Sequence, residues 1–291
     1  MNTYVLFHES CNDGTGAKYA CWRQFKDQAK YISVQYDRPF PDDVVLDINT
    51  HIYIVDFSYP RNILENIRQQ VGSLTVIDHH ESAMEDLKDF PGVYFDMEHS
   101  GAVLTWKYFN PGVEVPYVLQ LVEDRDIWRY DLPESKALAE VLSSDAIYNK
   151  METWDLLAHS QKYLEEALHK GTILLQSKIN KVNVFTKSSR PKYTISNILG
   201  HPFIIYNTTE HISDLAEAFY TDPKIGVDCT ASYFIDAGGD MIISFRSAKD
   251  SKVNLSKLAK ELGGGGHFHA AGCRIKFPES LKMLESFFVK R

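Results

Sequence analysis

Five short apolar runs alternate with helix-like segments in the first hundred residues of this 291-residue chain. Each run is rich in β-branched and aromatic residues and is bounded by polar or turn residues, which is typical of a buried strand. The intervening segments carry helical spacing, and one of them begins with a proline suited to a first helical turn. Strands that alternate with helices indicate a parallel sheet covered on both faces. The expected strands are residues 3–7, 31–36, 52–55, 74–77 and 93–95.

The remainder of the chain predicts a helical connector followed by a second domain. From about residue 100 the pattern is helical and ends in a long helical run over residues 153–185. The polar, proline-terminated segment 186–191 predicts a domain boundary. Beyond it, strand-like and helix-like segments alternate again. We therefore expect an α/β protein, with a parallel-sheet domain and its helical connector over residues 1–186 and a smaller α/β domain over residues 187–291.

Charge and cysteine content exclude several classes of protein. A net charge of -8 argues against stable binding of duplex nucleic acid, because such binding usually requires a basic field. The 4 cysteines include no CxxC pair, which argues against structural zinc and a disulfide framework and favours a reducing cytoplasm. The sequence has neither a signal-peptide pattern nor an apolar stretch long enough to cross a membrane. We expect a cytoplasmic protein without a membrane partner, and a homodimer is left open.

Residues that commonly bind metals stand at the ends of three expected strands. The first strand ends in His8, the third in Asp56, and the fourth in Asp78, His79 and His80. Ligands of open parallel sheets bind beyond the carboxyl ends of the strands, so we expect these side chains to meet at one edge. A single aspartate after a strand is usually a turn or cap residue, but that role does not explain the recurrence. Mixed carboxylate and imidazole ligands suit Mn²⁺ and related ions.

These residues resemble the DHH phosphoesterase superfamily, and a second signature in the C-terminal half supports the resemblance. The glycine-rich segment GGGGHFHAAG at residues 263–272 is similar to the signature of the DHH-associated C-terminal domain. Both signatures occur in the expected order, and together they cover nearly the whole chain. The resemblance extends to nanoRNase/pAp phosphatase and exopolyphosphatase-like proteins. Its N-terminal motifs are IDHH at residues 77–80, VDFS at 55–58, and His8 followed by Asp13-Gly14.

The resemblance implies a metal centre and two supporting residues. The implied ligands, with Asp56 placed to bridge two ions, are His8, Asp13, Asp56, His79 and Asp124. Asp126 is the alternative to Asp124, because either could match the last aspartate of the family. Asp78 is implied to orient its neighbours through hydrogen bonds, and His80 to contact substrate or to orient a ligand. The expected cofactor is Mn²⁺, as one or two ions, with Mg²⁺ or Co²⁺ as alternatives.

The first motif of this chain departs from the family pattern at Cys11. The family commonly carries two aspartates separated by one residue, and Asp13 fits the second of them. Cys11 stands at the first position, and the loss of a hard carboxylate is expected to weaken one metal site or to change its metal preference. A thiolate ligand is one alternative, but we expect Cys11 to be a packed or loosely placed thiol.

In the second domain, the resemblance implies contacts to the substrate. Arg246 and His267 are implied to contact a terminal phosphate or its sugar, and Gly264, Gly265 and Gly266 to let the backbone approach it. A flexible hinge is the alternative explanation for the glycines.

The implied activity is metal-assisted hydrolysis of phosphodiester or phosphomonoester bonds in short oligonucleotides, dinucleotides or related nucleotides. An aromatic residue such as Trp128 is a candidate for stacking on a base. The closest alternative is a phosphoanhydride hydrolase of the exopolyphosphatase or pyrophosphatase type. A nucleotide-binding protein without activity is the other alternative, and the missing aspartate is its only support.

Overall fold

The chain folds into two compact units in a computed structural model that describes residues 2–9, 11–36, 38–188, 192–266 and 268–288. The units are Met1–Leu175 and Gln176–Arg291. Helix α8 (Gln161–Thr186) begins in the first unit and ends in the second. The boundary that the sequence predicts after residue 186 falls at the end of this helix. The roles expected for the two domains stay predictions.

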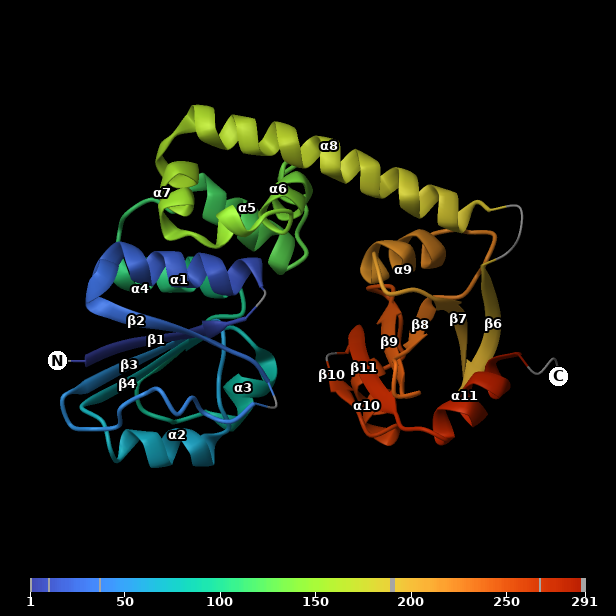
Figure 1. The fold of residues 1–291 in the computed structure, drawn as a ribbon, viewed down its shortest axis with the longest axis horizontal. Coiled ribbons are helices and arrows are strands. Elements are labelled where there is room, and N and C mark those ends of the chain that lie inside the picture. The colour runs from blue at the N-terminus through green and yellow to red at the C-terminus, as the bar shows by residue number, and fades with distance from the viewer. Residues whose placement is uncertain (1, 10, 37, 189–191, 267, 289–291) are drawn as a thin grey trace. The chain divides into compact units, whose positions relative to one another are not determined.

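The first unit contains a parallel sheet with the strand order β2-β1-β3-β4-β5 (Figure 1), as the sequence predicts. The chain passes from β1 to β2 on one side and then returns to β3 on the other side of β1. Strands β1 and β3 therefore flank the topological switch point, where open parallel sheets bind ligands. The strands are β1 (Asn2–His8), β2 (Ala29–Val34), β3 (Thr50–Val55), β4 (Ser73–Asp78) and β5 (Val93–Phe95).

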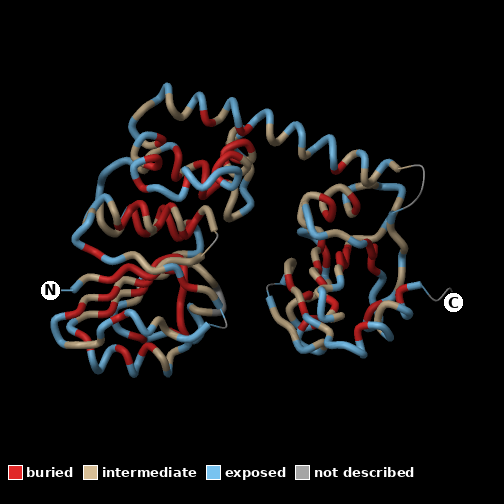
Figure 2. The backbone as a smooth tube through the Cα atoms, viewed as in Figure 1, coloured by how far each residue is buried: buried red, intermediate tan, exposed pale blue. Residues whose placement is uncertain are grey.

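Alternate residues of the strands face two different layers of helices. Val5 of β1 packs with Ala17 and Cys21 of α1, whereas Leu6 belongs to the core on the opposite face with Leu64 of α2. Buried residues accordingly line both faces of the sheet (Figure 2). The helical segments between the strands and directly after them are α1 (Asn12–Phe25), η1 (Lys26–Gln28), α2 (Arg61–Arg68), α3 (Glu81–Asp86) and α4 (Gly101–Phe109).

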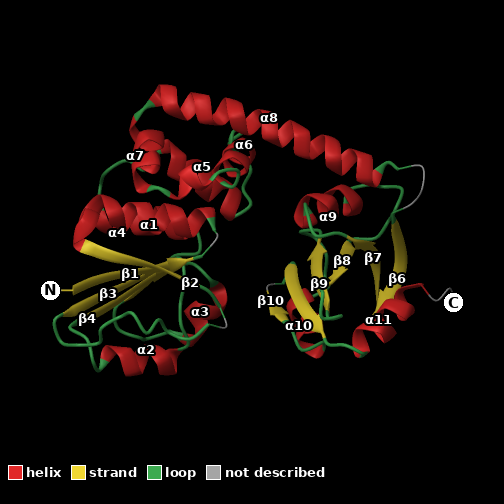
Figure 3. Ribbon diagram, viewed as in Figure 1, coloured by secondary structure: helices red, strands yellow, loops and turns green. Residues whose placement is uncertain are grey.

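A helical layer follows the sheet and packs against α1 and α4 around Trp106, Leu119 and Trp154 (Figure 3). The long helical run expected over residues 153–185 is two helices, because the backbone at Ser160 is extended. Helix α8 has 26 residues, yet none of the helices in the described ranges is apolar enough along its length to cross a bilayer. The segments before α8 are α5 (Tyr117–Asp126), α6 (Ser135–Leu142), η2 (Ala146–Asn149) and α7 (Met151–His159).

The second unit is the expected second α/β domain, with a sheet of order β10-β11-β9-β8-β7-β6. Its neighbouring strands are antiparallel apart from β7 and β8. Val182 of α8 and Phe219 of α9 cover one face, and Leu258 of α10 and Phe287 of α11 belong to the core on the other. The elements are β6 (Tyr193–Ile198), β7 (His201–Asn207), α9 (Ile212–Tyr220), β8 (Cys229–Ile235), β9 (Met241–Ser247), α10 (Leu255–Glu261), β10 (Gly265–Gly266), β11 (Ala270–Ile275) and α11 (Glu279–Phe288).

Candidate functional site

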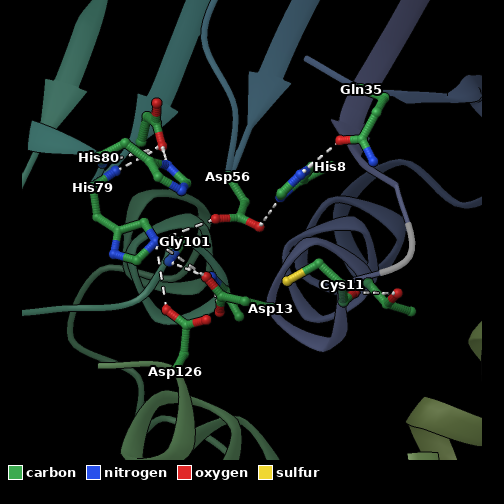
Figure 4. Close-up of polar contacts among 12 residues, drawn as sticks. His8, Cys11, Asp13, Gln35, Asp56, His79, His80, Gly101 and Asp126 are labelled. Carbon is green, nitrogen blue, oxygen red and sulfur yellow. Dashed lines mark hydrogen bonds and ion pairs between the residues drawn. The ribbon is translucent and has the colours of Figure 1, made fainter. Parts of the chain in front are cut away.

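Histidine and aspartate side chains meet at the carboxyl edge of the first sheet, beside the switch point (Figure 4). His8 is the last residue of β1, and Asp56 follows the last residue of β3. His79 and His80 directly follow β4, which ends at Asp78. The distance from Asp56 Oδ2 to His8 Nδ1 is 3.6 Å, and that from Asp56 Oδ1 to His79 Nε2 is 3.3 Å.

Asp56 is the central residue of this arrangement. Its φ of 53° lies in the left-handed region, which is costly for a non-glycine residue and is found at sites where the surrounding structure imposes it. The residue is only 1% exposed. Neither carboxylate oxygen accepts a hydrogen bond from any residue in the described part of the chain. A buried carboxylate without hydrogen bonds is costly, and a bound cation would remove this cost.

Two further carboxylates approach His79 from the helical layer. Its Nε2 lies 3.7 Å from Asp13 Oδ2 and 3.5 Å from Asp126 Oδ2. Asp13 is in the first turn of α1, and Asp126 is the last residue of α5. The oxygens of Asp13 also accept hydrogen bonds from the backbone N–H groups of Gly101, at 2.6 Å, and Ala102, at 3.0 Å. The N-terminus of α4 therefore fixes the orientation of the Asp13 carboxylate.

Among the residues that the structure describes, the ligand atoms form three overlapping groups, in each of which they lie within 4.8 Å of one another. Asp56 belongs to two of the groups, as does His79, so the groups are parts of one connected site. The residue types are the oxygen and nitrogen ligands that Mn²⁺ and related ions accept. The side chains thus fit a centre of one or two divalent ions. The groups are His8, Cys11 and Asp56; Asp56, His79 and His80; and Asp13, His79 and Asp126.

Crowding of negative charge shifts the pKa values of the carboxyl groups. Burial and the neighbouring Asp56 carboxylate raise the pKa of Asp13 well above its usual range. The same two causes raise the pKa of Asp126 to about 6. Burial alone would lower the pKa of His79, but the adjacent Asp56 carboxylate and the charges of Asp13 and Asp126 outweigh it and raise that pKa to about 10. The site therefore stabilises positive charge at its centre.

These shifts predict that metal binding releases a proton from His79. With a pKa of about 10, the imidazole is protonated at neutral pH before a metal binds, and it has to lose this proton to offer a lone pair. The apparent affinity for Mn²⁺ should therefore weaken by about tenfold for each unit that the pH falls below that value. Calorimetric titrations in two buffers of different ionisation enthalpy measure the protons released. The His79→Gln variant should release about one proton less, and an affinity independent of pH in the wild type would contradict the prediction.

Asp78 orients its two histidine neighbours through hydrogen bonds. Its Oδ1 accepts hydrogen bonds from the His79 backbone N–H, at 2.8 Å, and from His80 Nδ1, at 2.7 Å. Its Oδ2 accepts from the Ser58 hydroxyl at 2.7 Å. These hydrogen bonds hold the carboxylate, which is not a member of the metal-ligand groups that the described residues form. The hydrogen bond from His80 Nδ1 to Asp78 fixes the orientation of the imidazole ring.

Asp124 lies apart from the ligand groups that the described residues form, although it is next but one to Asp126. Its Oδ1 accepts from the Asp131 backbone N–H at 2.7 Å, and its carbonyl accepts from Arg129 and Tyr130. Residues two apart on an α-helix point in nearly opposite directions, because the helix turns by about 100° per residue. Of the two alternatives, the structure brings Asp126 to the cluster.

The residues expected to contact substrate in the second unit occupy strand ends. Arg246 is half-buried in β9, where Nε donates to the Ser213 hydroxyl at 3.2 Å and a terminal nitrogen donates to the Phe245 carbonyl at 2.8 Å. Gly265 and Gly266 form β10 and pair with β11. A Cβ at Gly264 would lie 2.1 Å from the Gly272 carbonyl oxygen, so close packing requires a glycine at this position. His267 lies outside the described residues.

Several residues at the site were not anticipated from the sequence. Strand β2 ends at Val34 rather than at residue 36, so Gln35 and Tyr36 follow its carboxyl end. Gln35 Oε1 lies 3.1 Å from His8 Nε2, and the ring of Tyr36 lies 5.4 Å from that of His8. The sequence signal that could have identified Gln35 and Tyr36 is their position directly after a strand. Trp128, the candidate for stacking on a base, is close to Tyr130, with ring centroids 5.8 Å apart.

This chain is similar to a known domain family in its second unit and to known proteins over most of its length. The DHHA1 domain model matches residues 204–290. Over 286 residues the chain is 29% identical to an uncharacterised protein, R106, of Acanthamoeba polyphaga mimivirus, covering 92% of this chain and 66% of that protein. It is 23% identical to oligoribonuclease NrnB of Bacillus subtilis over 246 residues, covering 77% of this chain and 59% of that protein. The chain thus spans less than two thirds of the length of either relative.

One solved structure extends the likeness to the fold of the whole chain. The pGpG-specific phosphodiesterase PggH from Vibrio cholerae superposes with a TM-score of 0.58 and 15% sequence identity, covering 98% of this chain and 97% of that one. The chain thus contains a DHHA1 domain over residues 204–290 and shares the fold of this phosphodiesterase.

Proposed function

We propose that the protein is a metal-dependent phosphoesterase that hydrolyses phosphodiester or phosphomonoester bonds in short oligonucleotides, dinucleotides or related nucleotides. The observation that carries this proposal is the convergence of Asp13, Asp56, Asp126 and His79 at the switch point of the first sheet. Two relatives bear the names oligoribonuclease and pGpG-specific phosphodiesterase, which are activities on short nucleotides. Cytoplasmic location and a homodimer stay predictions.

The residues proposed to hold Mn²⁺ are those of the overlapping ligand groups. Asp56 and His79 would each serve more than one group, since Asp56 Oδ2 faces His8 and Asp56 Oδ1 faces His79. When bound, such ions activate water as a nucleophile near neutral pH and offset negative charge on the phosphoryl group. The alternatives are Co²⁺, which accepts the same oxygen and nitrogen ligands, and Mg²⁺, which favours the carboxylate oxygens.

The other residues of the edge are proposed to orient the reacting groups. The bond from His80 Nδ1 to Asp78 orients the imidazole, and we propose that His80 contacts the substrate or orients a metal ligand. Ser58 holds the second oxygen of Asp78, so the imidazole stays in one orientation. A held orientation raises the rate because the reacting groups need no further ordering in the transition state.

The substrate class is tested by a product-resolved panel run with Mn²⁺. The panel holds dinucleotides, trinucleotides, cyclic dinucleotides, adenosine 3′,5′-bisphosphate and polyphosphate. The proposal expects turnover of at least one short nucleotide and its loss on treatment with a chelator. Release of phosphate from polyphosphate alone would contradict the proposed linkage, and tight nucleotide binding without turnover on any substrate would contradict the activity itself.

A pair of neighbouring variants separates the two aspartates of α5. Asp126→Asn should weaken Mn²⁺ binding by about tenfold or more, because its carboxylate lies 3.5 Å from His79 Nε2. Asp124→Asn should leave the metal affinity nearly unchanged, because the Asp124 carboxylate accepts a hydrogen bond from the Asp131 backbone instead. Calorimetric Mn²⁺ titration of both variants, with thermal unfolding as a check of folding, makes the comparison. The reverse order of metal affinities would overturn the choice of Asp126.

Arg246→Ala should raise KM while kcat changes little. We propose that Arg246 binds a phosphate group of the substrate, and its guanidinium is already oriented by Ser213 and Phe245. A hydrogen bond to a charged group contributes about 1.5–3 kcal/mol, which corresponds to a rise in KM of about tenfold to a hundredfold. Arg274→Ala on neighbouring β11 is the matched control, because Arg274 is exposed and bonded to Asp236. Equal kinetic effects of the two variants would count against the role of Arg246.

A further inference from the structure

The thiol of Cys11 belongs to the cluster of ligand atoms that also contains His8 and Asp56. Cys11 directly precedes α1, where its extended backbone (φ −118°, ψ 136°) places it as the N-cap residue. Its carbonyl accepts hydrogen bonds from the backbone N–H and the hydroxyl of Thr15, but its side chain makes no capping bond to the helix. The sulfur is directed toward the aspartate and histidine instead (Figure 4).

The orientation of His8 provides an independent indication of a cation here. Its Nε2 lies 3.1 Å from Gln35 Oε1, and because an amide oxygen only accepts, Nε2 has to be the donor. A neutral imidazole in this tautomer presents its Nδ1 lone pair toward Asp56 Oδ2, 3.6 Å away. A cation between the two atoms, whether a proton or a metal ion, offsets the repulsion between the lone pair and the carboxylate, so the pair is placed to hold one.

Asp56 adds a second independent indication. It is 1% exposed, and Oδ2 accepts no hydrogen bond from the residues that the structure describes. The oxygen faces the same space as His8 Nδ1 and the Cys11 sulfur. Three potential ligands of three chemical kinds, a thiol, an imidazole and an unpaired buried carboxylate, thus surround one position. At the other position, among Asp13, His79 and Asp126, the ligands found in the described part of the chain are carboxylates and an imidazole.

We propose that Cys11 is a thiolate ligand, so that the two metal positions differ in chemistry. This inference rests on the metal-dependent function proposed above and deepens it. On binding, the thiol loses its proton to solvent and the sulfur donates an electron pair to the ion, with no change of oxidation state. Thiolate and imidazole ligands select Zn²⁺ or Co²⁺, whereas the carboxylate-rich position suits Mn²⁺ or Mg²⁺. The replacement of an aspartate by Cys11 therefore changes which metal binds rather than removing a site.

Cobalt spectroscopy tests the ligand directly, without an activity measurement. The metal-free protein is titrated with Co²⁺, and the near-ultraviolet charge-transfer band between thiolate sulfur and cobalt is recorded. The wild type should show the band and Cys11→Ser should lack it. Cys21→Ala is the matched control on the same helix and should retain the band, because Cys21 is buried in the core between α1 and the sheet. A wild type without the band, or a band that persists in Cys11→Ser, would overturn the inference.

A variant that restores the carboxylate gives a second readout. Cys11→Asp should lower the ratio of Zn²⁺ affinity to Mn²⁺ affinity by about tenfold or more at one of the bound ions. An unchanged ratio would also contradict the thiolate ligand. Thermal unfolding with and without metal shows that each variant is folded.

The same preparations distinguish failure of this inference from failure of the proposed function. Hydrolysis of a dinucleotide by a wild type that lacks the charge-transfer band would refute the thiolate ligand and leave the phosphoesterase in place. A charge-transfer band in a protein that hydrolyses nothing on the panel would support the ligand and refute the activity.

Discussion

Asp56→Asn should lower kcat/KM for the best dinucleotide substrate by more than about a hundredfold. Mutation of a residue that only hydrogen-bonds to a metal ligand already costs about tenfold to a hundredfold in activity or metal affinity. Both oxygens of Asp56 are buried without hydrogen bonds from the described residues, and they face the two histidines on either side. An amide keeps the shape of the side chain but removes its charge. Asp56 is a ligand of the position with His8 and Cys11, and its Oδ1 lies 3.3 Å from His79 Nε2 of the other position, so this single change affects both proposed metal positions.

Metal-dependent stability gives a readout of Asp56→Asn that does not depend on turnover. A ligand present at a hundred times its Kd stabilises the folded state by about 2.7 kcal/mol. The wild type should show a stabilisation of this order in thermal unfolding with Mn²⁺, and Asp56→Asn should lose most of it at the same concentration. Asp43→Asn, an exposed aspartate in the loop between β2 and β3, is the control and should behave as the wild type. Full activity in Asp56→Asn would refute the metal centre.

The strand ends were the part of the site that the sequence could predict. A buried parallel strand is a short apolar run, and the first polar residue after it marks its carboxyl end. His8, Asp56 and Asp78 were found in this way, and the parallel order of the sheet places all three at one edge. Adjacency of β1 and β3 could not be read from the sequence, because it depends on where the chain reverses direction across the sheet.

The site residues that lie on helices were harder to predict, because it matters which side of the helix each residue faces and not only where it stands in the sequence. Asp124 and Asp126 are indistinguishable as acidic residues at the end of an apolar helix, yet the structure directs only the second toward His79. The position of the Cys11 sulfur could not be predicted, because the sequence does not show where a side chain just before a helix points. The extended backbone of Cys11 turns the sulfur toward His8.

The glycine-rich segment of the second unit illustrates a different limit. Composition suggested either a hinge or a phosphate-binding loop, whereas the structure places Gly265 and Gly266 in a short strand and extends β11 back to Ala270. A Cβ at Gly266 would lie 2.5 Å from the Cα of Ala271. Close strand packing therefore explains the small residues in this region without a ligand, and substrate contact by the glycines stays a prediction.

A second large effect is expected at Gly101, which contributes no side chain to the site. A Cβ there would lie 2.5 Å from Asp56 Cβ and 2.7 Å from Asp56 Oδ1. Its backbone N–H also donates to Asp13 Oδ2 at 2.6 Å, so a shift of this residue would move two carboxylates together. A misplacement of about 1 Å in a catalytic site can cost about a hundredfold in rate. We therefore expect Gly101→Ala to lower kcat/KM by about a hundredfold and to weaken Mn²⁺ binding.

The stability of Gly101→Ala depends on two opposing effects, one on the helix and one on the packing around Asp56. Gly101 begins α4, and its φ lies outside the left-handed region, so alanine should favour the helix by up to about 1 kcal/mol. The clash with Asp56 offsets this gain, since forcing a methyl group into a packed site typically costs about 1–3 kcal/mol. Gly238→Ala, in the turn between β8 and β9, is the control, because its Cβ would meet only Asp236 Oδ1, at 3.3 Å. A Gly101→Ala protein that is more stable than the wild type and fully active would show that the carboxylate of Asp56 does not depend on the close approach of α4.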